Sequence, residues 1–97
     1  MADKIDLAER LSAVTAPWTP MIVGELNGQH VKLAKFDGSF VWHRHEDVDE
    51  LFLVLRGRIR VCLRDREITL GEGEMLIVPR GVEHKPVADE PADVLIF

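Results

Sequence analysis

Closely spaced turn residues divide most of this chain into short segments, and they limit its fold more than any other feature. Asn27-Gly28 and Asp37-Gly38 are typical of two-residue β-hairpin turns. Further turns are expected near 46–48, 56–57, 65, 71–73 and 79–81. The segments between them predict short strands at 21–26, 29–36, 39–45, 50–55, 59–63, 66–70, 74–78, 82–87 and 93–97. Many short strands at near-regular spacing predict an all-β protein, an antiparallel sandwich or barrel.

The first twenty residues have a different pattern. Apolar residues recur at helical spacing over 4–14 and predict a short amphipathic helix. Trp18 and Pro20 predict an extended arm after it. We therefore expect a helix and arm over 1–20 and a single β-barrel domain over 21–97. The final segment looks like the middle of a strand, which either pairs fully within the sheet or has been cut short.

Composition excludes several classes of protein. A chain of 97 residues suits one compact domain. The formal net charge of −5 argues against nucleic-acid binding, because phosphate binding needs a basic face. The arginines between 56 and 66 are interpreted as a solvated outer strand face. No apolar run approaches the roughly 20 residues that span a bilayer, so we expect no membrane partner.

The cysteine content and the N-terminus bear on the compartment. Cys62 is the only cysteine and cannot form an intrachain disulfide, which favours a reducing compartment. The N-terminal residues are acidic and lack the cationic-then-apolar pattern of a signal peptide. We therefore expect a cytoplasmic protein in which Cys62 is a packing residue.

Three histidines and one glutamate form the strongest chemical pattern. His43 and His45 fall on one face of the predicted strand 39–45, about 6.6–7 Å apart along the backbone. Glu50 begins the next strand, which a hairpin return brings level with the histidines, and His84 lies on a later strand. Three imidazoles and a carboxylate suit one divalent transition-metal ion per chain (Fe, Mn, Ni or Zn), with coordination positions left for water or substrate.

The spacing around these residues resembles the two motifs of the cupin superfamily. The first motif reads Gly38-SFVW-His43-R-His45-EDVD-Glu50-LFLVLR-Gly57, and the second reads Gly73-EMLIV-Pro79-R-Gly81-VE-His84. In cupins the two histidines and the glutamate of the first motif and the histidine of the second bind the metal. The resemblance therefore implies His43, His45, Glu50 and His84 as ligands. It also implies a double-stranded β-helix, the jelly-roll or cupin barrel, here preceded by a short N-terminal helix.

Two positions depart from the cupin pattern. Four residues rather than five separate Gly38 from His43, and Ala88 stands where an asparagine often closes the second motif. Neither position is a ligand, so the implied metal set is unchanged.

Alternation along the predicted strands divides the side chains into inner and outer faces. Val41 shares the face of the histidines, and Phe52, Val54 and Val61 are expected to complete an apolar interior around the metal. His30 and Arg80 are interpreted as surface groups near the rim of the barrel. The sequence identifies no general base, so the catalytic residues are unknown.

The opposite strand faces are also apolar. They carry Phe40, Trp42, Leu51, Leu53 and Leu55. An exposed apolar face of this size needs cover, and we expect the N-terminal arm and a second copy of the chain to supply it. This predicts a homodimer, with Trp18 and Trp42 as core or interface anchors.

The resemblance and the apolar interior favour a small metal-dependent cupin enzyme that acts on a small organic molecule. Its metal is expected to activate dioxygen, as in cupin dioxygenases, or to act as a Lewis acid on a carbonyl. A cupin-type sugar isomerase is ranked lower, because the interior has few groups to hold several hydroxyls. A small-molecule-binding cupin without turnover is the alternative from another class, since fold resemblance does not decide function.

Overall fold

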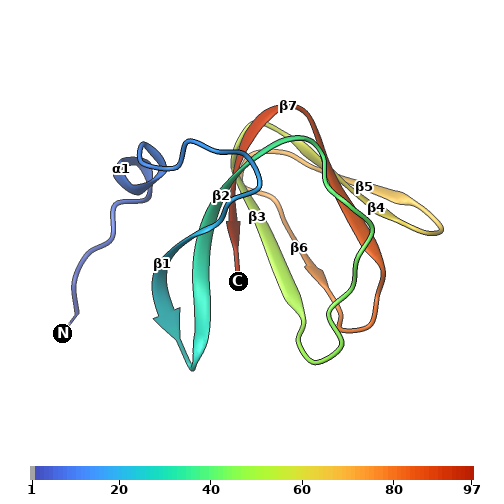
Figure 1. The fold of residues 1–97 in the computed structure, drawn as a ribbon, viewed down its shortest axis with the longest axis horizontal. Coiled ribbons are helices and arrows are strands. Elements are labelled where there is room, and N and C mark those ends of the chain that lie inside the picture. The colour runs from blue at the N-terminus through green and yellow to red at the C-terminus, as the bar shows by residue number, and fades with distance from the viewer. Residues whose placement is uncertain (1) are drawn as a thin grey trace.

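Seven strands and one short helix form within residues 2–97, which the computed structural model describes (Figure 1). They are α1 (Leu7–Leu11), β1 (Met21–Leu26), β2 (Gln29–Ser39), β3 (Glu50–Arg56), β4 (Ile59–Leu63), β5 (Glu67–Leu70), β6 (Met75–Val78) and β7 (His84–Ile96). Over residues 2–97, no helix has the length and apolar character required to cross a membrane.

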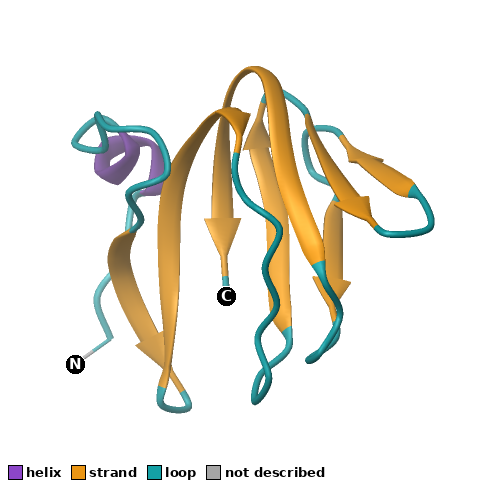
Figure 2. Ribbon diagram, turned by 45° about the vertical axis from the view of Figure 1, so that its right-hand side comes forward, coloured by secondary structure: helices purple, strands orange, loops and turns teal. Residues whose placement is uncertain are grey.

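Strand β7 lies at the centre of the architecture. The sheet order is β1-β2-β7-β3-β6, and the β4-β5 hairpin joins it through β4, which also pairs with β7. The first residues of β7, 84–87, pair with β4, whereas its last residues, 93–96, pair with β3. Strand β2 follows β7 along both parts. The antiparallel sheet therefore curls around β7 (Figures 1 and 2), which confirms the predicted jelly-roll fold.

The first predicted hairpin is confirmed. Strands β1 and β2 are antiparallel, and Leu26 pairs with Gln29 across the two-residue turn Asn27-Gly28. Both turn residues have positive φ, +54° for Asn27 and +77° for Gly28. This is the geometry of a type I′ turn, whose twist matches that of the flanking strands.

The second predicted hairpin, at Asp37-Gly38, is wrong. β2 continues through it to Ser39, and Gly38 has a φ of +80°. The pairing with β7 jumps there, because Phe36 lies opposite Ala92 whereas Gly38 lies opposite Ala88. A glycine at positive φ serves a β-bulge as well as a turn, and here it bends β2 where β7 changes partners.

Three further boundaries differ from the prediction. Residues 40–45 form a loop with one isolated bridge, between His43 and His84, rather than a strand. The predicted strands 82–87 and 93–97 are one continuous strand, β7. The helix expected over 4–14 is limited to α1, because the backbone N–H groups of Ala13 and Val14 bond three residues back in tight turns.

The core lies inside the curled sheet. Phe52, Val54 and Val61 are buried in it, as alternation predicts. Their neighbours are aliphatic and aromatic residues of every other strand except β1, among them Phe36, Ile59, Leu70, Val78 and Val94. Cys62 follows Val61 in β4 and is also buried, although it does not join this cluster. The interior of the curled sheet is therefore apolar.

Candidate metal centre

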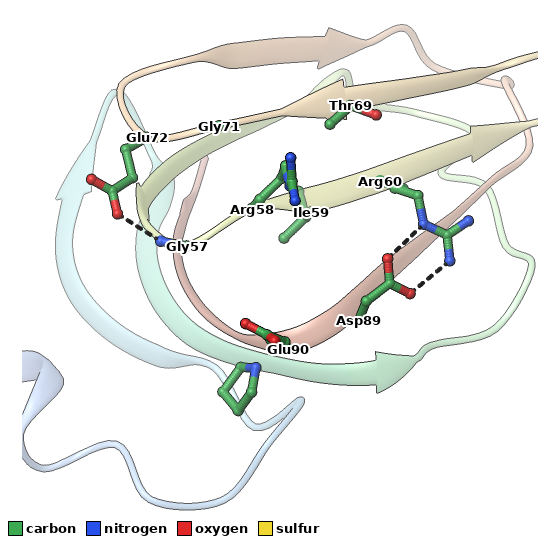
Figure 3. A pocket seen from close by; sticks show the side chains of 10 residues that line it. Gly57, Arg58, Ile59, Arg60, Thr69, Gly71, Glu72, Asp89 and Glu90 are labelled. Atoms are coloured by element: carbon green, nitrogen blue, oxygen red, sulfur yellow. Dashed lines mark hydrogen bonds and ion pairs between the residues drawn. The ribbon is translucent and has the colours of Figure 1, made fainter.

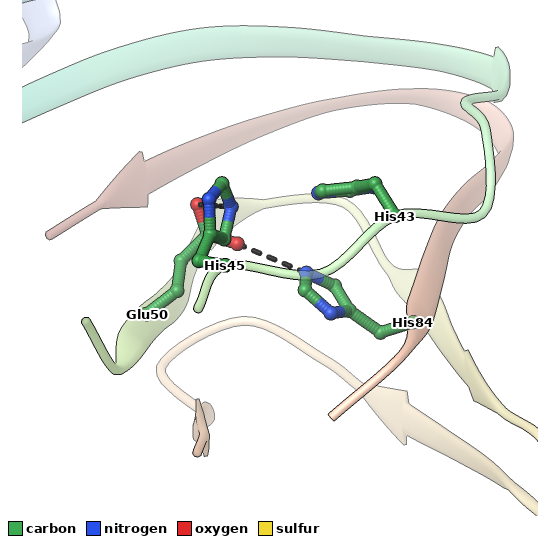
Figure 4. Close-up of side chains that lie close together, drawn as sticks. All are labelled: His43, His45, Glu50 and His84. Atoms are coloured by element: carbon green, nitrogen blue, oxygen red, sulfur yellow. Dashed lines mark hydrogen bonds and ion pairs between the residues drawn. The ribbon is translucent and has the colours of Figure 1, made fainter. Parts of the chain in front are cut away.

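The four residues singled out from the sequence lie together at the end of the barrel where β3 and β7 begin (Figure 4). Glu50 is the first residue of β3 and His84 the first residue of β7. His43 and His45 lie in the loop between β2 and β3, which we call the 40–49 loop. The backbone N–H of His43 donates to the carbonyl of His84 at 3.0 Å, and the reverse bond is 2.9 Å. This bridge places a loop histidine against the strand that carries His84.

The 40–49 loop is also tied to the turn that precedes β7. The backbone N–H of Gly81 donates to the His45 carbonyl at 2.7 Å. The Asp49 carboxylate accepts from the Arg80 backbone N–H at 2.9 Å and from its guanidinium at 3.2 Å. Donation by Arg80, first from its backbone and then from its side chain, lowers the pKa of Asp49 despite an opposing desolvation cost. These bonds fix the histidines from outside the cluster.

The donor atoms of the four residues are close enough to share one ion. One nitrogen from each histidine and one oxygen of Glu50 all lie within 4.8 Å of one another. Nε2 of His45 is buried and has no hydrogen-bond partner, although Glu50 Oε2 lies 3.4 Å away in poor hydrogen-bond geometry. A buried unpartnered imidazole nitrogen is costly, and a cation at the centre of the cluster would satisfy it. The residues present therefore fit a metal ion.

Two of the histidines are oriented by backbone carbonyls. Nδ1 of His43 bonds to the Val41 carbonyl at 2.9 Å, and Nδ1 of His84 bonds to the Val82 carbonyl at 2.9 Å. A carbonyl only accepts, so each Nδ1 must carry a proton and donate it. The other nitrogen, Nε2, is then the one available to a cation, as in many histidine metal sites.

Glu50 and His84 form the tightest contact in the cluster. Nε2 of His84 lies 3.0 Å from Oε1 of Glu50. Burial of Glu50 opposes its ionisation, but the hydrogen bond from His84 and the nearby histidine charges outweigh burial, so the pKa of Glu50 lies below its ordinary value. Burial of His84 likewise opposes its charge, but hydrogen bonds to Glu50 and Val82 and the carboxylate charge raise the pKa of His84. Without metal, the cluster therefore favours an imidazolium–carboxylate pair.

A cavity of about 180 Å³ adjoins the cluster. Its walls are mainly apolar and aromatic, and His43, His45 and Glu50 line one side of it. Phe40 faces this cavity, whereas alternation predicted it on the outer face, and Val41, predicted inside, is 59% exposed. Both predictions are wrong for the same reason. Phe40 and Val41 lie in a loop, and successive side chains alternate between two faces only in a strand.

The surroundings of the cluster contain residues that sequence reasoning did not assign to the site. Trp18, interpreted from sequence as a core or interface anchor, lines the cavity, as do Lys32 and Phe36 of β2. The even-numbered positions of β2 face inward. Alternation along the predicted strand 29–36 could therefore have assigned Lys32 and Phe36 to the inner face. His30 and Arg80 are exposed, as predicted; His30 borders a neighbouring cavity of about 230 Å³ that His45 and Glu50 also line.

A larger cavity of about 650 Å³ lies at the far end of β3, around Gly57 and the turn of β7 (Figure 3). Its central arginine, Arg60, is held by two carboxylates. The Arg60 guanidinium pairs with Asp89 at 2.9 Å and with Glu67 at 3.2 Å, and the bond from Arg60 lowers the pKa of Asp89. Its lining includes no histidine or cysteine. The clustered histidines and Glu50 therefore belong to the smaller cavity and not to this one.

Comparison with known proteins agrees with the geometry. The family profile described as "Cupin domain" matches residues 29–97. The crystal structure of a cupin-2 domain containing protein from Shewanella frigidimarina is 42% identical, with a TM-score of 0.93 over 95% of this chain and 90% of that chain. Uncharacterized protein YdbB of Bacillus subtilis is 39% identical over 64 residues, which span 65% of this chain and 57% of YdbB.

Enzymes of known structure share the fold at lower identity, and one of them serves as an example. It is hydroquinone 1,2-dioxygenase from Sphingomonas sp. TTNP3, whose crystal structure holds 4-hydroxybenzoate. It is 22% identical, with a TM-score of 0.76 over 89% of this chain and 68% of that chain. This likeness shows a common fold alone.

Proposed function

Because this chain belongs to the cupin domain family, we propose that it binds one divalent transition-metal ion through His43, His45, Glu50 and His84 and uses it on a small organic molecule. The observation that carries the proposal is the cluster itself. Four donor atoms lie within 4.8 Å of one another, and the buried Nε2 of His45 has no other partner. An N3O donor set suits Fe, Mn, Ni or Zn and discriminates poorly among them.

The residues around the cluster prepare it for such a role. The carbonyls of Val41 and Val82 hold two imidazoles in fixed orientations, and the Glu50 carboxylate supplies one negative charge in a partly buried position. Phe52 and the other apolar walls exclude water from one side of the site. When bound, the metal would supply dioxygen activation or Lewis-acid polarisation of a carbonyl.

The cavity bears on which function is favoured. A volume of about 180 Å³ with apolar walls suits a small organic substrate and not a sugar that presents several hydroxyls, so isomerisation of a sugar is the weaker candidate. A binding protein without turnover is the remaining alternative. Oxygen uptake by the iron-loaded protein with a panel of small diols, thiols and β-diketones separates a dioxygenase from a binding protein, because a binder consumes no oxygen.

Elemental analysis tests the metal site directly. Protein purified without added metal should contain about one transition-metal ion per chain. His45→Ala should lose most of this metal, because it removes a donor at the centre of the cluster. His30→Ala is the matched control, since His30 borders the adjacent cavity but is absent from the cluster. Equal metal content in the two variants would refute the proposed ligand set.

The assembly and setting of the protein are part of the same proposal. We propose a homodimer through the outer face of β3 and β6, where Met75 and Ile77 are more than half exposed beside half-buried leucines of β3.

The segment 1–20 is proposed to act as an arm beside the barrel of 21–97. A reducing, cytoplasmic setting is proposed from the single buried thiol of Cys62.

A further inference from the structure

The cavity beside the cluster has an aromatic wall built from separate parts of the chain. The ring of Trp18 stacks on Phe36 at a centroid distance of 4.4 Å and on Phe40 at 5.0 Å. Phe52 meets Phe36 edge-on at 6.2 Å, and all four rings line the cavity. Aromatic rings form favourable offset-stacked or edge-to-face contacts with further aromatic rings. The wall therefore favours a planar ligand.

Trp18 is held in this wall at a conformational cost. Its φ is +59°, in the left-handed region that bulky residues avoid. Two hydrogen bonds to β2 hold it there, from its backbone N–H to the Lys35 carbonyl at 2.9 Å and from its indole N–H to the Asp37 carbonyl at 2.8 Å. Strained backbone that the surrounding structure enforces is concentrated at binding and catalytic sites. The two bonds therefore fix the indole ring in the wall of the cavity.

The size of the cavity limits the ligand. An apolar cavity of about 150 Å³ is known to accept benzene. The cavity here measures about 180 Å³. It therefore has room for one six-membered ring with a small substituent.

Lys32 adds a charge to this apolar site. It lies on the same inward face of β2 as Ala34 and Phe36, and it lines both the aromatic cavity and the neighbouring cavity of about 230 Å³. Among residues 2–97, no carboxylate lies within ion-pair distance of its ammonium, whereas Lys35 on the opposite face is paired with Asp93. A lysine at the edge of an aromatic cavity, without an ion-pair partner, is suited to hold an anionic group of a ligand.

We propose that the ligand is a small arene carboxylate, whose ring packs against the wall of Trp18, Phe36, Phe40 and Phe52 and whose anionic oxygens pair with Lys32. This inference rests on the proposed function, since it takes the aromatic cavity as the substrate cavity of the metal site. It adds a chemical class of ligand and a residue that determines specificity.

Calorimetric titration tests the inference with three probes. Benzoate has the ring and the charge, benzyl alcohol has the ring alone, and acetate has the charge alone. The zinc-loaded protein should bind benzoate about tenfold more tightly than benzyl alcohol, and acetate most weakly. Lys32→Gln should remove the preference for benzoate and leave benzyl alcohol unchanged. Phe40→Ala should weaken both aromatic probes, and it is a tolerable change because Phe40 is 39% exposed.

Lys85→Gln is the matched control. The ammonium of Lys85 lies 5.4 Å above the ring of Trp42 and does not line the cavity, so benzoate binding should be unchanged. Equal affinity for benzoate and benzyl alcohol, or an equal loss in the Lys32 and Lys85 variants, would overturn the inference.

Metal analysis of the same samples separates this inference from the proposed function. The aromatic wall and Lys32 are not part of the metal cluster, so Lys32→Gln should keep its metal. If the wild-type protein holds no metal yet binds benzoate in a Lys32-dependent way, the proposed function fails and the ligand class stands. If metal is present but the charge preference is absent, the ligand class fails alone.

Discussion

At the scale of single residues, the contact between Glu50 and His84 makes the stability of the fold depend on pH and, under the proposed function, on metal. The lowered pKa of Glu50 means that its contribution to stability is present above about pH 4.5 and is lost as the pH falls through the lowered pKa. The raised pKa of His84 means that its contribution is present below about pH 6.5 and is lost as the pH rises through the raised pKa. The pair therefore stabilises the metal-free protein most between these two values.

This predicts opposite pH dependences for the metal-free and zinc-loaded proteins. In the presence of a chelator, thermal stability should fall as the pH rises from 6 to 8, because His84 loses its proton and the ion pair with Glu50. With zinc, stability should rise over the same range, because protons no longer compete for the imidazole nitrogens. Thermal denaturation at a series of pH values measures both trends.

A variant isolates the contribution of the pair from that of other titrating groups. His84→Gln should flatten the fall seen in the metal-free protein and remove the rise seen with zinc. If both forms of the wild-type protein show the same slope, the histidine and the carboxylate do not control stability in this range.

The four clustered residues could be predicted from sequence, because their motif spacings do not depend on local strand geometry. The cavity walls could not be predicted in full, because alternation holds only within a strand. It placed Phe52 and Val54 correctly in β3 and misplaced Phe40 and Val41, which lie in a loop. Trp18 required knowledge of which segments meet across the barrel, whereas alternation along β2 was enough to place Lys32 on the same face as Phe36.

At the scale of elements, the 40–49 loop supplies two histidines although it has no regular structure. The pair between Asp49 and Arg80 ties it to the turn before β7. Asp49→Ala should lower the affinity for zinc about three- to tenfold, because the loop must then be ordered when the metal binds. Thermal stability of the metal-free protein should change little, since the pair is exposed.

Competition titration with a fluorescent zinc chelator measures this effect. Asp47→Ala is the control, since Asp47 is exposed on the same loop and lies outside the ion pairs and side-chain hydrogen bonds found over residues 2–97. Similar affinities in the two variants would show that the Asp49 contacts do not position the ligands.

The turn between β3 and β4 is a second element whose geometry can be tested. Gly57 has a φ of +86°, and an added Cβ would lie 3.1 Å from the Pro91 carbonyl oxygen and 3.2 Å from Cα of Ala92. Gly73 has a similar φ of +80° but open space around the same position. Gly73→Ala should cost about 1 kcal/mol of unfolding free energy through backbone strain alone.

Gly57→Ala should cost more, about 2–4 kcal/mol, because the backbone of β7 cannot move aside easily. Urea denaturation of both variants gives the comparison. Equal losses would mean that β7 shifts to accept the methyl group.

The two hairpin signals show how far turn residues predict elements. Asn27-Gly28 made the expected turn because the two strands that flank it, β1 and β2, pair with each other directly across it. Asp37-Gly38 is an equally typical turn dipeptide. It forms a bulge instead, because β2 pairs with β7 on both sides of it. Long-range pairing decided between the two outcomes, and a local dipeptide carries no information about that pairing.

At the scale of the whole molecule, the outer face of β3 and β6 is the surface expected to join two copies of the chain. Ile77 of β6 is 51% exposed and lies opposite Leu51 of β3. Ile77→Glu should convert the proposed dimer to a monomer at micromolar concentration, because an unpaired carboxylate would be buried in the interface. Sedimentation velocity measures the change.

Ile22→Glu is the control for this substitution. Ile22 has nearly the same exposure, 52%, but it lies in β1, at the opposite end of the strand order from β6. A wild-type protein that sediments as a monomer, or loss of the dimer in both variants, would contradict the proposed interface.

The central position of β7 has a consequence for biosynthesis. β7 follows the other six strands in the sequence, yet it is the common partner of β2, β3 and β4. A nascent chain that has not yet emerged from the ribosome past residue 84 lacks the strand that joins its hairpins. Closure of the barrel must therefore wait until β7 has been translated, and the unpaired edges of the earlier strands are exposed to chaperones and to other nascent chains during that interval.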